Sequence, residues 1–263
     1  MAIKAVLFDL DDTLIVDEAV TKDALHATAA LASEQHGTDQ TVFLSDAARL
    51  GKAFWEASPS HRYCLEIGII DHECLWGDFP GDNPEVVTLR KWARNYRRAL
   101  FDAVLRAQEI SDEDAAEALA REFASSRRRL QRLMPDARET LARLRISRRI
   151  ALLTNGDSGL QREKITASGL GKFFDAIAIS GECGVGKPRA EIFHALLAEL
   201  ALEPNEAVMV GNSLERDIAG AKNAGLAGAI WLRVPGSEEP ADVLPDHTID
   251  GLHELPALLD PLK

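Results

Sequence analysis

Short apolar runs that alternate with helical segments constrain the fold of this chain more than any other feature. After residue 134 the runs are IALLT (150–154), AIAIS (176–180), AVMVG (207–211) and AGAIWL (227–232). Buried apolar strands joined by helices of this length form a parallel sheet with right-handed crossovers. Residues 4–9 are predicted to add a strand to the same sheet. We therefore expect an α/β fold with a Rossmann-like parallel sheet core made from both ends of the chain.

Residues 15–133 carry apolar side chains at helical spacing instead, so we expect this part to be all-helical. One apolar stripe predicts a helix over about 85–108, and Ser111 with Asp114 resembles a capping box at the start of the next helix. Residues 58–84 are rich in proline and glycine and are predicted to be irregular, with at most a short helix.

The change of pattern along the chain predicts two domains. Residues 1–14 and 134–263 would form the α/β catalytic core, and residues 15–133 would form a helical cap domain inserted after the first strand. A chain of 263 residues is long enough to bury a core in each.

Charge and composition narrow the range of partners and compartments. The chain has 30 Lys and Arg against 42 Asp and Glu, a formal charge of −12 that disfavours binding to nucleic acid or to an anionic membrane. The N-terminal stretch MAIKAVLFDL is short and interrupted by charge, so it is predicted to be a core strand and not a signal sequence or a membrane span. Three scattered cysteines do not suit a disulfide framework. We expect a cytoplasmic monomer or homodimer with a small-molecule partner.

The first apolar run leads directly into acidic residues, since residues 6–14 read VLFDLDDTL. Side chains two positions apart on an extended chain share a face, so Asp9, Asp11 and Thr13 can address one ligand. Two close carboxylates repel, and they need a cation, a shared proton or separate roles. The carboxyl end of a buried strand is also where open α/β sheets hold their ligands. A helix-capping acidic loop is the simpler alternative.

Polar groups also follow the strand at 150–154, where Thr154, Asn155 and Gly156 begin the next connection. A hydroxyl, an amide and exposed backbone N–H groups at a helix N-terminus can form a cradle for an anion, although an ordinary strand-to-helix turn has the same residues. Lys187 stands between a glycine and a proline just ahead of a helix. This setting favours an ammonium group that points at the site over one in solvent.

Asn212, Ser213 and Asp217 follow the strand at 207–211. Asn212 or Ser213 could simply cap the next helix. Asp217, about one turn later, would supply a further oxygen ligand at a site that holds a cation.

Four motifs together resemble the haloacid dehalogenase superfamily, specifically its phosphatases with a helical C1-type cap between the first two motifs. The segments DLDDTL, LLTNGD, GKPRAEIF and VGNSLERDIAGAKNAG match the family's motifs in the right order, each after a strand or before a helix. The resemblance covers residues 1–14 and 134–263, and it is specific as a set.

The resemblance implies a magnesium-dependent phosphomonoester hydrolase that works through an aspartyl-phosphate intermediate. Asp9 would be the nucleophile, and Asp11 would protonate the leaving oxygen and then deprotonate the attacking water. Lys187 would balance the negative charge of the site. The implied substrate-binding residues are Thr13, Thr154, Asn155 and Gly156, and the implied Mg²⁺ ligands are Asp9, Asp11, Asn212 and Asp217.

The chain departs from the family at one position, because the fourth motif usually begins Gly-Asp and here Asn212 takes the place of that acid. An amide oxygen can still bind Mg²⁺ but carries no formal charge, so we expect weaker magnesium binding. This substitution also leaves open a weakly active or inactive binding protein that retains the fold.

Asp11 indicates the type of reaction, and two motif segments indicate the class of substrate. The dehalogenases that name the superfamily need no acid two residues after the nucleophile, so Asp11 favours phosphoryl transfer over a 2-haloacid dehalogenase-type reaction. Within the family, TNGDSGLQREKI and GVGKPRAEIF are most similar to the branch that includes nucleoside 5′-monophosphate and acylneuraminate phosphate phosphatases. The expected substrate is a small phosphorylated metabolite, a nucleotide or a sugar phosphate.

Two clusters in the predicted cap domain have simpler interpretations than a binding site. His61, Cys64, His72 and Cys74 are metal-ligand types, but their spacing matches no known zinc finger and favours burial in a core. The arginines near residue 130 could recruit an anionic substrate, but a solvated helix face is the favoured interpretation. These arginines are Arg127, Arg128, Arg129 and Arg132.

Overall fold

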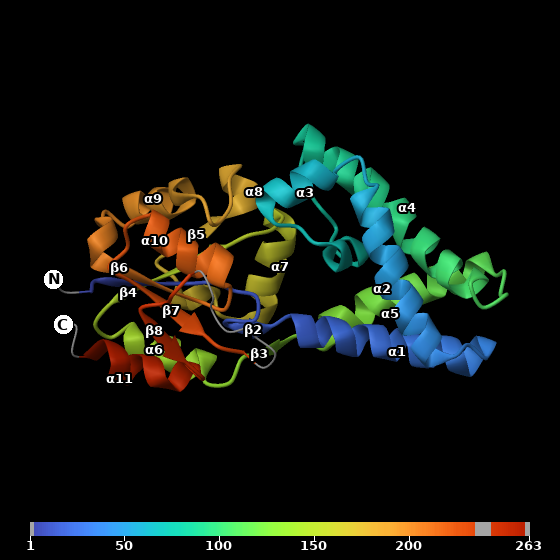
Figure 1. Cartoon of the computed structure of the whole chain (residues 1–263), viewed down its shortest axis with the longest axis horizontal. Coiled ribbons are helices and arrows are strands. Elements are labelled where there is room, and N and C mark those ends of the chain that lie inside the picture. Colours follow the sequence, from blue (N-terminus) through green and yellow to red (C-terminus); the bar gives the residue numbers. More distant parts are fainter. Residues whose placement is uncertain (1–2, 235–242, 261–263) are drawn as a thin grey trace. The chain divides into compact units, whose positions relative to one another are not determined.

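The computed structural model describes residues 3–234 and 243–260, and its course is drawn in Figure 1. The chain separates into two compact units. The first consists of Met1–Val16 and Arg132–Lys263, and the second consists of Asp17–Gln131.

The first unit is organised around one parallel sheet. Its strands are β1 (Ala5–Phe8), β4 (Arg149–Thr154), β5 (Ala176–Ile179), β6 (Ala207–Gly211), β7 (Gly228–Leu232) and β8 (His247–Ile249). Their order across the sheet is β5-β4-β1-β6-β7-β8, and β1 lies between β4 and β6. The prediction of a parallel α/β sheet made from both ends of the chain is therefore confirmed, and the edge strand β8 is an addition to it.

Helices cover both faces of this sheet because its strands are apolar on both sides. In β1, Val6 and Phe8 belong to one buried cluster and Ala5 and Leu7 to the other, as the alternation of side chains along a strand requires. The first cluster includes residues of α6 (Ala137–Leu144), α7 (Ser158–Ser168) and α11 (Leu255–Leu259), and the second includes residues of α9 (Ala190–Glu199) and α10 (Gly220–Asn223). Figure 1 shows α9 and α10 on the opposite side of the sheet from α6 and α11.

The connections of the first unit contain further short elements. They are α8 (Ser180–Cys183), the 3-10 helices η2 (Gly171–Phe173), η3 (Pro204–Glu206) and η5 (Leu252–Glu254), and the π-helix η4 (Leu214–Ala219). A small antiparallel ribbon pairs β2 (Ile15–Val16) with β3 (Arg132–Leu133). The ribbon corrects the expectation that residues 15–133 are helical throughout, because strands of two residues have no detectable period. The first unit accordingly extends to Val16 and resumes at Arg132, whereas the sequence placed the boundaries after residue 14 and before residue 134.

The second unit is helical. Its elements are α1 (Glu18–His36), α2 (Gln40–Glu56), α3 (His61–Ile67), the 3-10 helix η1 (Asp71–Leu75), α4 (Pro84–Arg106) and α5 (Glu113–Arg129). Aromatic rings join three of these helices in the core, since Phe101 stacks on Phe43 at 6.0 Å and contacts Phe123 at 6.4 Å.

Two local predictions for the second unit need correction. Residues 58–84 contain two short helices, α3 and η1, instead of at most one. The residue that caps α5 is Asp112, whose Oδ1 accepts a hydrogen bond from the Ala115 N–H at 2.9 Å, and not Ser111. Both Ser and Asp are good caps, and the sequence alone did not decide between neighbours.

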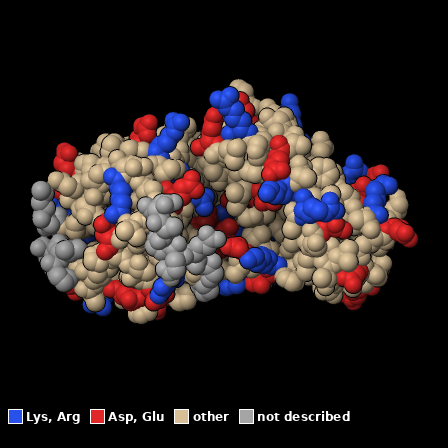
Figure 2. Space-filling model, viewed as in Figure 1, with Lys and Arg blue, Asp and Glu red and all other residues tan. Residues whose placement is uncertain are grey.

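The visible face of the molecule is mixed in charge. On the face drawn in Figure 2, basic and acidic side chains of the described residues are interspersed and form no extended basic surface. Among the described helices, none is long and apolar enough to cross a membrane.

Candidate active site

Polar residues meet where the central strands of the sheet end. Asp9 follows β1 directly, Thr154 is the last residue of β4, and Asn212 follows β6. Because these strands are parallel neighbours, their carboxyl ends share one edge of the sheet. The backbone N–H of Asp9 donates to the Val210 carbonyl at 3.0 Å, which continues the pairing of β1 with β6 up to the site.

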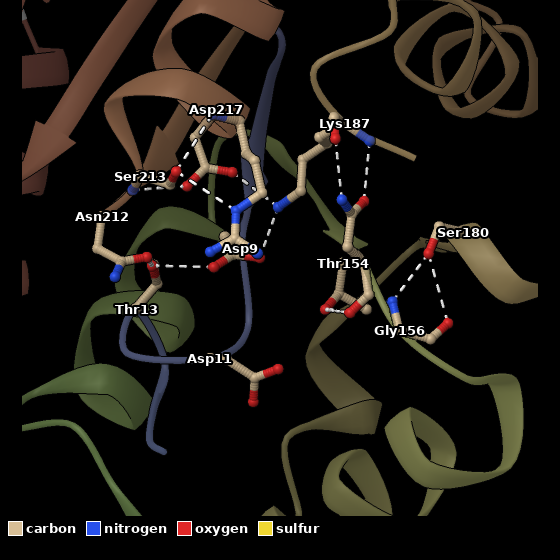
Figure 3. A network of polar contacts seen from close by, with 12 residues as sticks. Asp9, Asp11, Thr13, Thr154, Gly156, Ser180, Lys187, Asn212, Ser213 and Asp217 are labelled. Atoms are coloured by element: carbon tan, nitrogen blue, oxygen red, sulfur yellow. Dashed lines mark hydrogen bonds and ion pairs between the residues drawn. The ribbon is translucent and has the colours of Figure 1, made fainter. Parts of the chain in front are cut away.

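Lys187 joins the two acids that the sequence placed at this edge. Its Nζ lies 2.6 Å from Asp9 Oδ1 and 2.7 Å from Asp217 Oδ1 (Figure 3). All three side chains are buried, with residue exposures of 8% for Asp9, 5% for Lys187 and 1% for Asp217. The expectation that the lysine points at the acids and not into solvent is confirmed by these contacts.

The buried charges alter the proton affinity of their neighbours. Burial would lower the pKa of Lys187, but the carboxylates of Asp217 and Asp9 outweigh it and raise that pKa above its ordinary value. Burial raises the pKa of Asp217, with a further upward contribution from Asp9, against the opposing effect of Lys187. The lysine is therefore a cation shared by two carboxylates, and the trio carries an excess of negative charge.

Thr13 and Asn212 lie beside this trio. The Thr13 hydroxyl oxygen is 3.4 Å from both Asp9 Oδ2 and Asn212 Oδ1, so it can donate to one of them at a time. Ser213, and not Asn212, caps η4, since the Ser213 hydroxyl accepts from the Arg216 N–H at 3.2 Å. The amide oxygen of Asn212 thus faces the nucleophile candidate Asp9 through a shared hydroxyl.

The conformation of the chain after β6 depends on Gly211. A Cβ at this position would lie 2.2 Å from Asp217 Oδ2. The same Oδ2 accepts a hydrogen bond from the Ser213 N–H at 3.0 Å, which fixes the carboxylate against the strand end. Only glycine leaves room for the acid to reach Lys187.

The loop after β4, which the sequence predicted to bind an anion, makes hydrogen bonds with other parts of the protein in this structure. The Asn155 amide pairs with the backbone of Lys187, donating to its carbonyl at 2.9 Å and accepting from its N–H at 2.8 Å. The Gly156 N–H donates to the Ser180 hydroxyl at 2.8 Å (Figure 3). Thr154 is buried, and its hydroxyl lies 3.4 Å from the Asn155 carbonyl. The loop is thereby tied to the Lys187 segment, while its role in binding substrate stays a prediction.

Asp11 stands apart from the Asp9 group. Figure 3 shows its carboxylate separate from the Asp9, Lys187 and Asp217 contacts. Instead, Lys164 Nζ lies 3.0 Å from each Asp11 carboxylate oxygen, and Gln161 Nε2 donates to Asp11 Oδ2 at 3.0 Å. The sequence alone did not predict that these two α7 residues contact Asp11. Their spacing of three positions on a helix was the available signal, because it places both side chains on one face.

The donor set at the site fits a magnesium ion in its chemistry. Mg²⁺ prefers oxygen ligands, and the carboxylates of Asp9 and Asp217 with the amide oxygen of Asn212 supply them. The Thr13 hydroxyl contacts both Asp9 Oδ2 and Asn212 Oδ1, so these two oxygens lie around one group. In the part of the chain that the structure describes, no group of three or more His, Cys, Asp or Glu residues is arranged to hold a metal ion. A magnesium site here therefore depends on the amide and on backbone oxygens, and the zinc alternative at His61–Cys74 has no such group either.

Comparisons with known proteins place this chain in a family. A family model described as haloacid dehalogenase-like hydrolase matches residues 3–225. Phosphoserine phosphatase of Thermus thermophilus is 34% identical over 255 residues, which cover 96% of this chain and 97% of that protein. N-acylneuraminate-9-phosphatase of Mus musculus is 31% identical over 262 residues, which cover 98% of this chain and 94% of that protein.

Solved structures agree in fold. A HAD-hydrolase of Bacillus subtilis bound to magnesium superposes with a TM-score of 0.65 at 20% identity, and the match covers 99% of this chain and 100% of that one. At this identity the likeness shows the fold alone. The family match over residues 3–225, together with two relatives that align over nearly their whole length, establishes the relationship. The chain belongs to the haloacid dehalogenase-like hydrolases.

Proposed function

We propose that this hydrolase is a phosphatase that cleaves small phosphomonoesters through an aspartyl-phosphate intermediate. The observation that carries the proposal is the buried Asp9 carboxylate at the carboxyl end of β1, 2.6 Å from the Lys187 ammonium and followed two residues later by a second acid. The relatives that align over nearly the whole chain are named as phosphatases, which supports the same reaction class.

The two acids take separate roles in the proposed reaction. An oxygen of the Asp9 carboxylate attacks phosphorus, the bond from phosphorus to the ester oxygen breaks, and Asp11 gives that oxygen its proton. A water molecule then attacks phosphorus of the acyl phosphate, its proton passes to Asp11, and Asp9 is released with inorganic phosphate. Lys187 stays protonated and offsets the negative charge that the phosphoryl group brings beside Asp9.

The proposed cofactor is Mg²⁺. Asp9, Asp217 and Asn212 would hold it through side-chain oxygens, and Asp11 through its backbone carbonyl. When bound, the ion supplies positive charge that reduces the repulsion between the carboxylate nucleophile and the phosphate. Thr13, Thr154, Asn155 and Gly156 are proposed to contact the phosphoryl oxygens.

The proposed substrates are small phosphorylated metabolites, namely nucleotides and sugar phosphates. The relatives named for phosphoserine and for N-acylneuraminate 9-phosphate add those two compounds to the panel that must be tested. The residues that discriminate among these substrates are proposed to lie in the second unit, Asp17–Gln131, as the cap domain. The formal charge of −12 supports the proposal that the protein binds neither nucleic acid nor anionic membranes. We also propose that it is a cytoplasmic monomer or homodimer.

Phosphate release from a panel of phosphomonoesters, with and without magnesium, tests the proposal. We expect magnesium-dependent turnover of at least one alkyl phosphate and a loss of about 1,000-fold or more in Asp9→Asn, because an amide is not a competent nucleophile. Full turnover by Asp9→Asn would contradict the mechanism. Absence of turnover for every compound would favour the alternative of a binding protein, and halide release from a 2-haloacid would favour the dehalogenase reaction.

A further inference from the structure

Two residues of α7, which have no role in the proposed reaction as described above, donate hydrogen bonds to the Asp11 carboxylate. Lys164 Nζ lies 3.0 Å from Asp11 Oδ1 and 3.0 Å from Asp11 Oδ2, so the ammonium bridges both oxygens. Gln161 Nε2 donates to Asp11 Oδ2 at 3.0 Å. Three hydrogen bonds to two oxygens leave this side chain little freedom to rotate.

The burial of Lys164 indicates that its contact with Asp11 does more than stabilise the folded protein. The Lys164 side chain is 0% exposed, whereas that of Asp11 is 25% exposed. Taking an ammonium out of water costs several kcal/mol, and an apolar residue of similar volume is usually no less stabilising in such a position. A buried lysine at this position is therefore better explained by its effect on Asp11, whose carboxylate it holds in place.

Gln161 connects Asp11 to the loop after β4. The same Nε2 that donates to Asp11 also donates to the Asn155 carbonyl at 2.7 Å. The Gln161 side chain fills the space beside Gly156, where a Cβ would lie 2.5 Å from Nε2. The Asp11 carboxylate is thus held at a fixed place relative to the proposed phosphate-binding loop, and not merely against α7.

The start of α7 is fixed by a capping residue. Asp157 caps the helix by accepting from the Leu160 N–H at 3.0 Å, and Gln161 and Lys164 follow within the next two turns. Residues three apart on a helix lie on one face, so one short rigid element presents both donors to Asp11.

We propose that Lys164 and Gln161 are positioning residues that hold the Asp11 carboxyl group where it delivers a proton to the leaving-group oxygen. The inference rests on the proposed phosphatase function and assigns the residues on which its acid step depends. Misplacement of a proton donor by about 1 Å is enough to cost on the order of 100-fold in rate.

The dependence of rate on the leaving group distinguishes this role from a general structural one. An alkyl phosphate must have its leaving oxygen protonated, whereas p-nitrophenyl phosphate releases a stable phenolate that needs little help. Loss of Asp11 alignment should therefore slow the alkyl ester far more than the nitrophenyl ester. The parameter to compare is kcat/KM, because it reports the steps up to departure of the leaving group and excludes hydrolysis of the acyl phosphate.

The experiment measures kcat/KM of wild type, Lys164→Met, Lys164→Arg and Gln161→Met for p-nitrophenyl phosphate and for the alkyl phosphomonoester that the wild type hydrolyses best. For Lys164→Met we expect a fall of about 100-fold with the alkyl ester and less than about fivefold with the nitrophenyl ester. Lys164→Arg restores a cation and should recover most of the loss. Gln161→Met should show the same selectivity with a smaller loss.

Two controls separate positioning from damage to the fold. Arg162→Met removes a cation from the same helix, where Arg162 pairs with Glu182 at 2.9 Å on the surface, and should leave both substrates unaffected. In an Asp11→Asn background, Lys164→Met should cost less than about twofold, because a residue that acts through Asp11 has nothing left to position. Circular dichroism melting confirms that each variant is folded.

Equal losses on both substrates, an increase in activity, or a full extra loss in the Asp11→Asn background would overturn the inference. The proposed function would survive these outcomes, since the wild type would still hydrolyse phosphomonoesters. A wild type that hydrolyses none of the panel would instead overturn the proposed function and this inference together.

Discussion

At the scale of single residues, the sequence pointed to both partners of the Asp9–Lys187 contact, but not to the contacts of Asp11 or of the loop after β4. Asp9 and Lys187 are 178 positions apart, and each was recognisable from its own strand end or Gly-Lys-Pro setting. The Gly156 N–H, in contrast, is engaged by Ser180, a residue of another strand end that no local pattern marks. Hydrogen-bond partners distant in the chain require the tertiary structure.

Arg127 shows the same limit in the second unit. The favoured interpretation was a solvated helix face, yet its residue exposure is 0%. Its guanidinium pairs with Asp17, donates to the Thr21 hydroxyl at 3.0 Å and lies 4.7 Å from the centre of the Trp76 ring. Neighbouring Arg129 is exposed, as expected. The sequence of a run of arginines does not show which of them faces inward. The interpretation of a solvated helix face was wrong for Arg127.

Asn212 carries the prediction that belongs to this scale. Replacing its amide by a carboxylate in Asn212→Asp puts a charged oxygen on the Thr13 hydroxyl that also contacts Asp9 Oδ2. We expect the magnesium concentration for half-maximal activity to fall by about tenfold, because charged ligands bind Mg²⁺ more tightly. Titration of phosphatase activity with MgCl₂ measures it, and Ser213→Asp, at the adjacent helix cap, serves as a charge-matched control. Unchanged metal dependence in Asn212→Asp would exclude a ligand role for this position.

At the scale of secondary structure, long patterned elements were predictable and short ones were not. The apolar strands β4, β5, β6 and β7 each form a buried run that the sequence displays directly. β8 has only three residues, two of them exposed, and β2 and β3 have two residues each. Such strands are too short to show a periodic pattern of apolar residues in the sequence. These short elements depend on pairing with a partner strand, which is a property of the fold and not of the segment.

The start of α5 gives a prediction at this scale. Asp112 accepts from the Ala115 N–H, whereas the neighbouring Ser111, which the capping-box pattern favoured, does not cap the helix. Asp112→Ala should lower the free energy of unfolding by about 1 kcal/mol, and the matched variant Ser111→Ala should change it by less than about 0.3 kcal/mol. Urea unfolding of both variants measures the difference. The reverse order of effects would restore the capping-box interpretation.

At the scale of the whole molecule, the sequence indicated how the chain is divided, because the change from strand-and-helix alternation to helical periodicity extends over many residues. The structure divides the chain at Val16 and Arg132, within two residues of the predicted positions. Such a coarse property averages over many side chains, so errors at single positions hardly affect it. The charged contacts of His72 in the second unit were not visible in the sequence, because they join η1 to Asp17, which precedes α1 and is distant in the chain.

We predict that the contacts of His72 make the stability of the second unit depend on pH. His72 Nε2 lies 3.7 Å from Asp17 Oδ2, and Nδ1 lies 3.4 Å from Asp71 Oδ1. Burial would lower the pKa of His72, but the two carboxylates outweigh it and raise the pKa from 6.5 to about 9. The folded state thus binds the proton more tightly than the unfolded state. The resulting stabilisation is fully present below pH 6.5 and is lost as the pH rises towards about 9.

The size and location of this effect can be measured. A shift in pKa from 6.5 to about 9 corresponds to at most about 3.5 kcal/mol, since each pKa unit is worth about 1.4 kcal/mol. Three of the four tryptophans, Trp55, Trp76 and Trp92, lie in the second unit, so tryptophan fluorescence during urea unfolding reports mainly on it.

We expect the urea midpoint of the wild type to decrease as the pH rises from 6.5 to 9. The midpoint of His72→Gln should be lower than that of the wild type at pH 6.5 and nearly independent of pH over this interval. His253→Gln replaces an exposed histidine of the first unit, whose side chain is 67% exposed, and should retain the wild-type decline. If His72→Gln declines as steeply as the wild type, the charge on His72 does not stabilise the fold, and its contacts with Asp17 and Asp71 are packing contacts of a neutral ring.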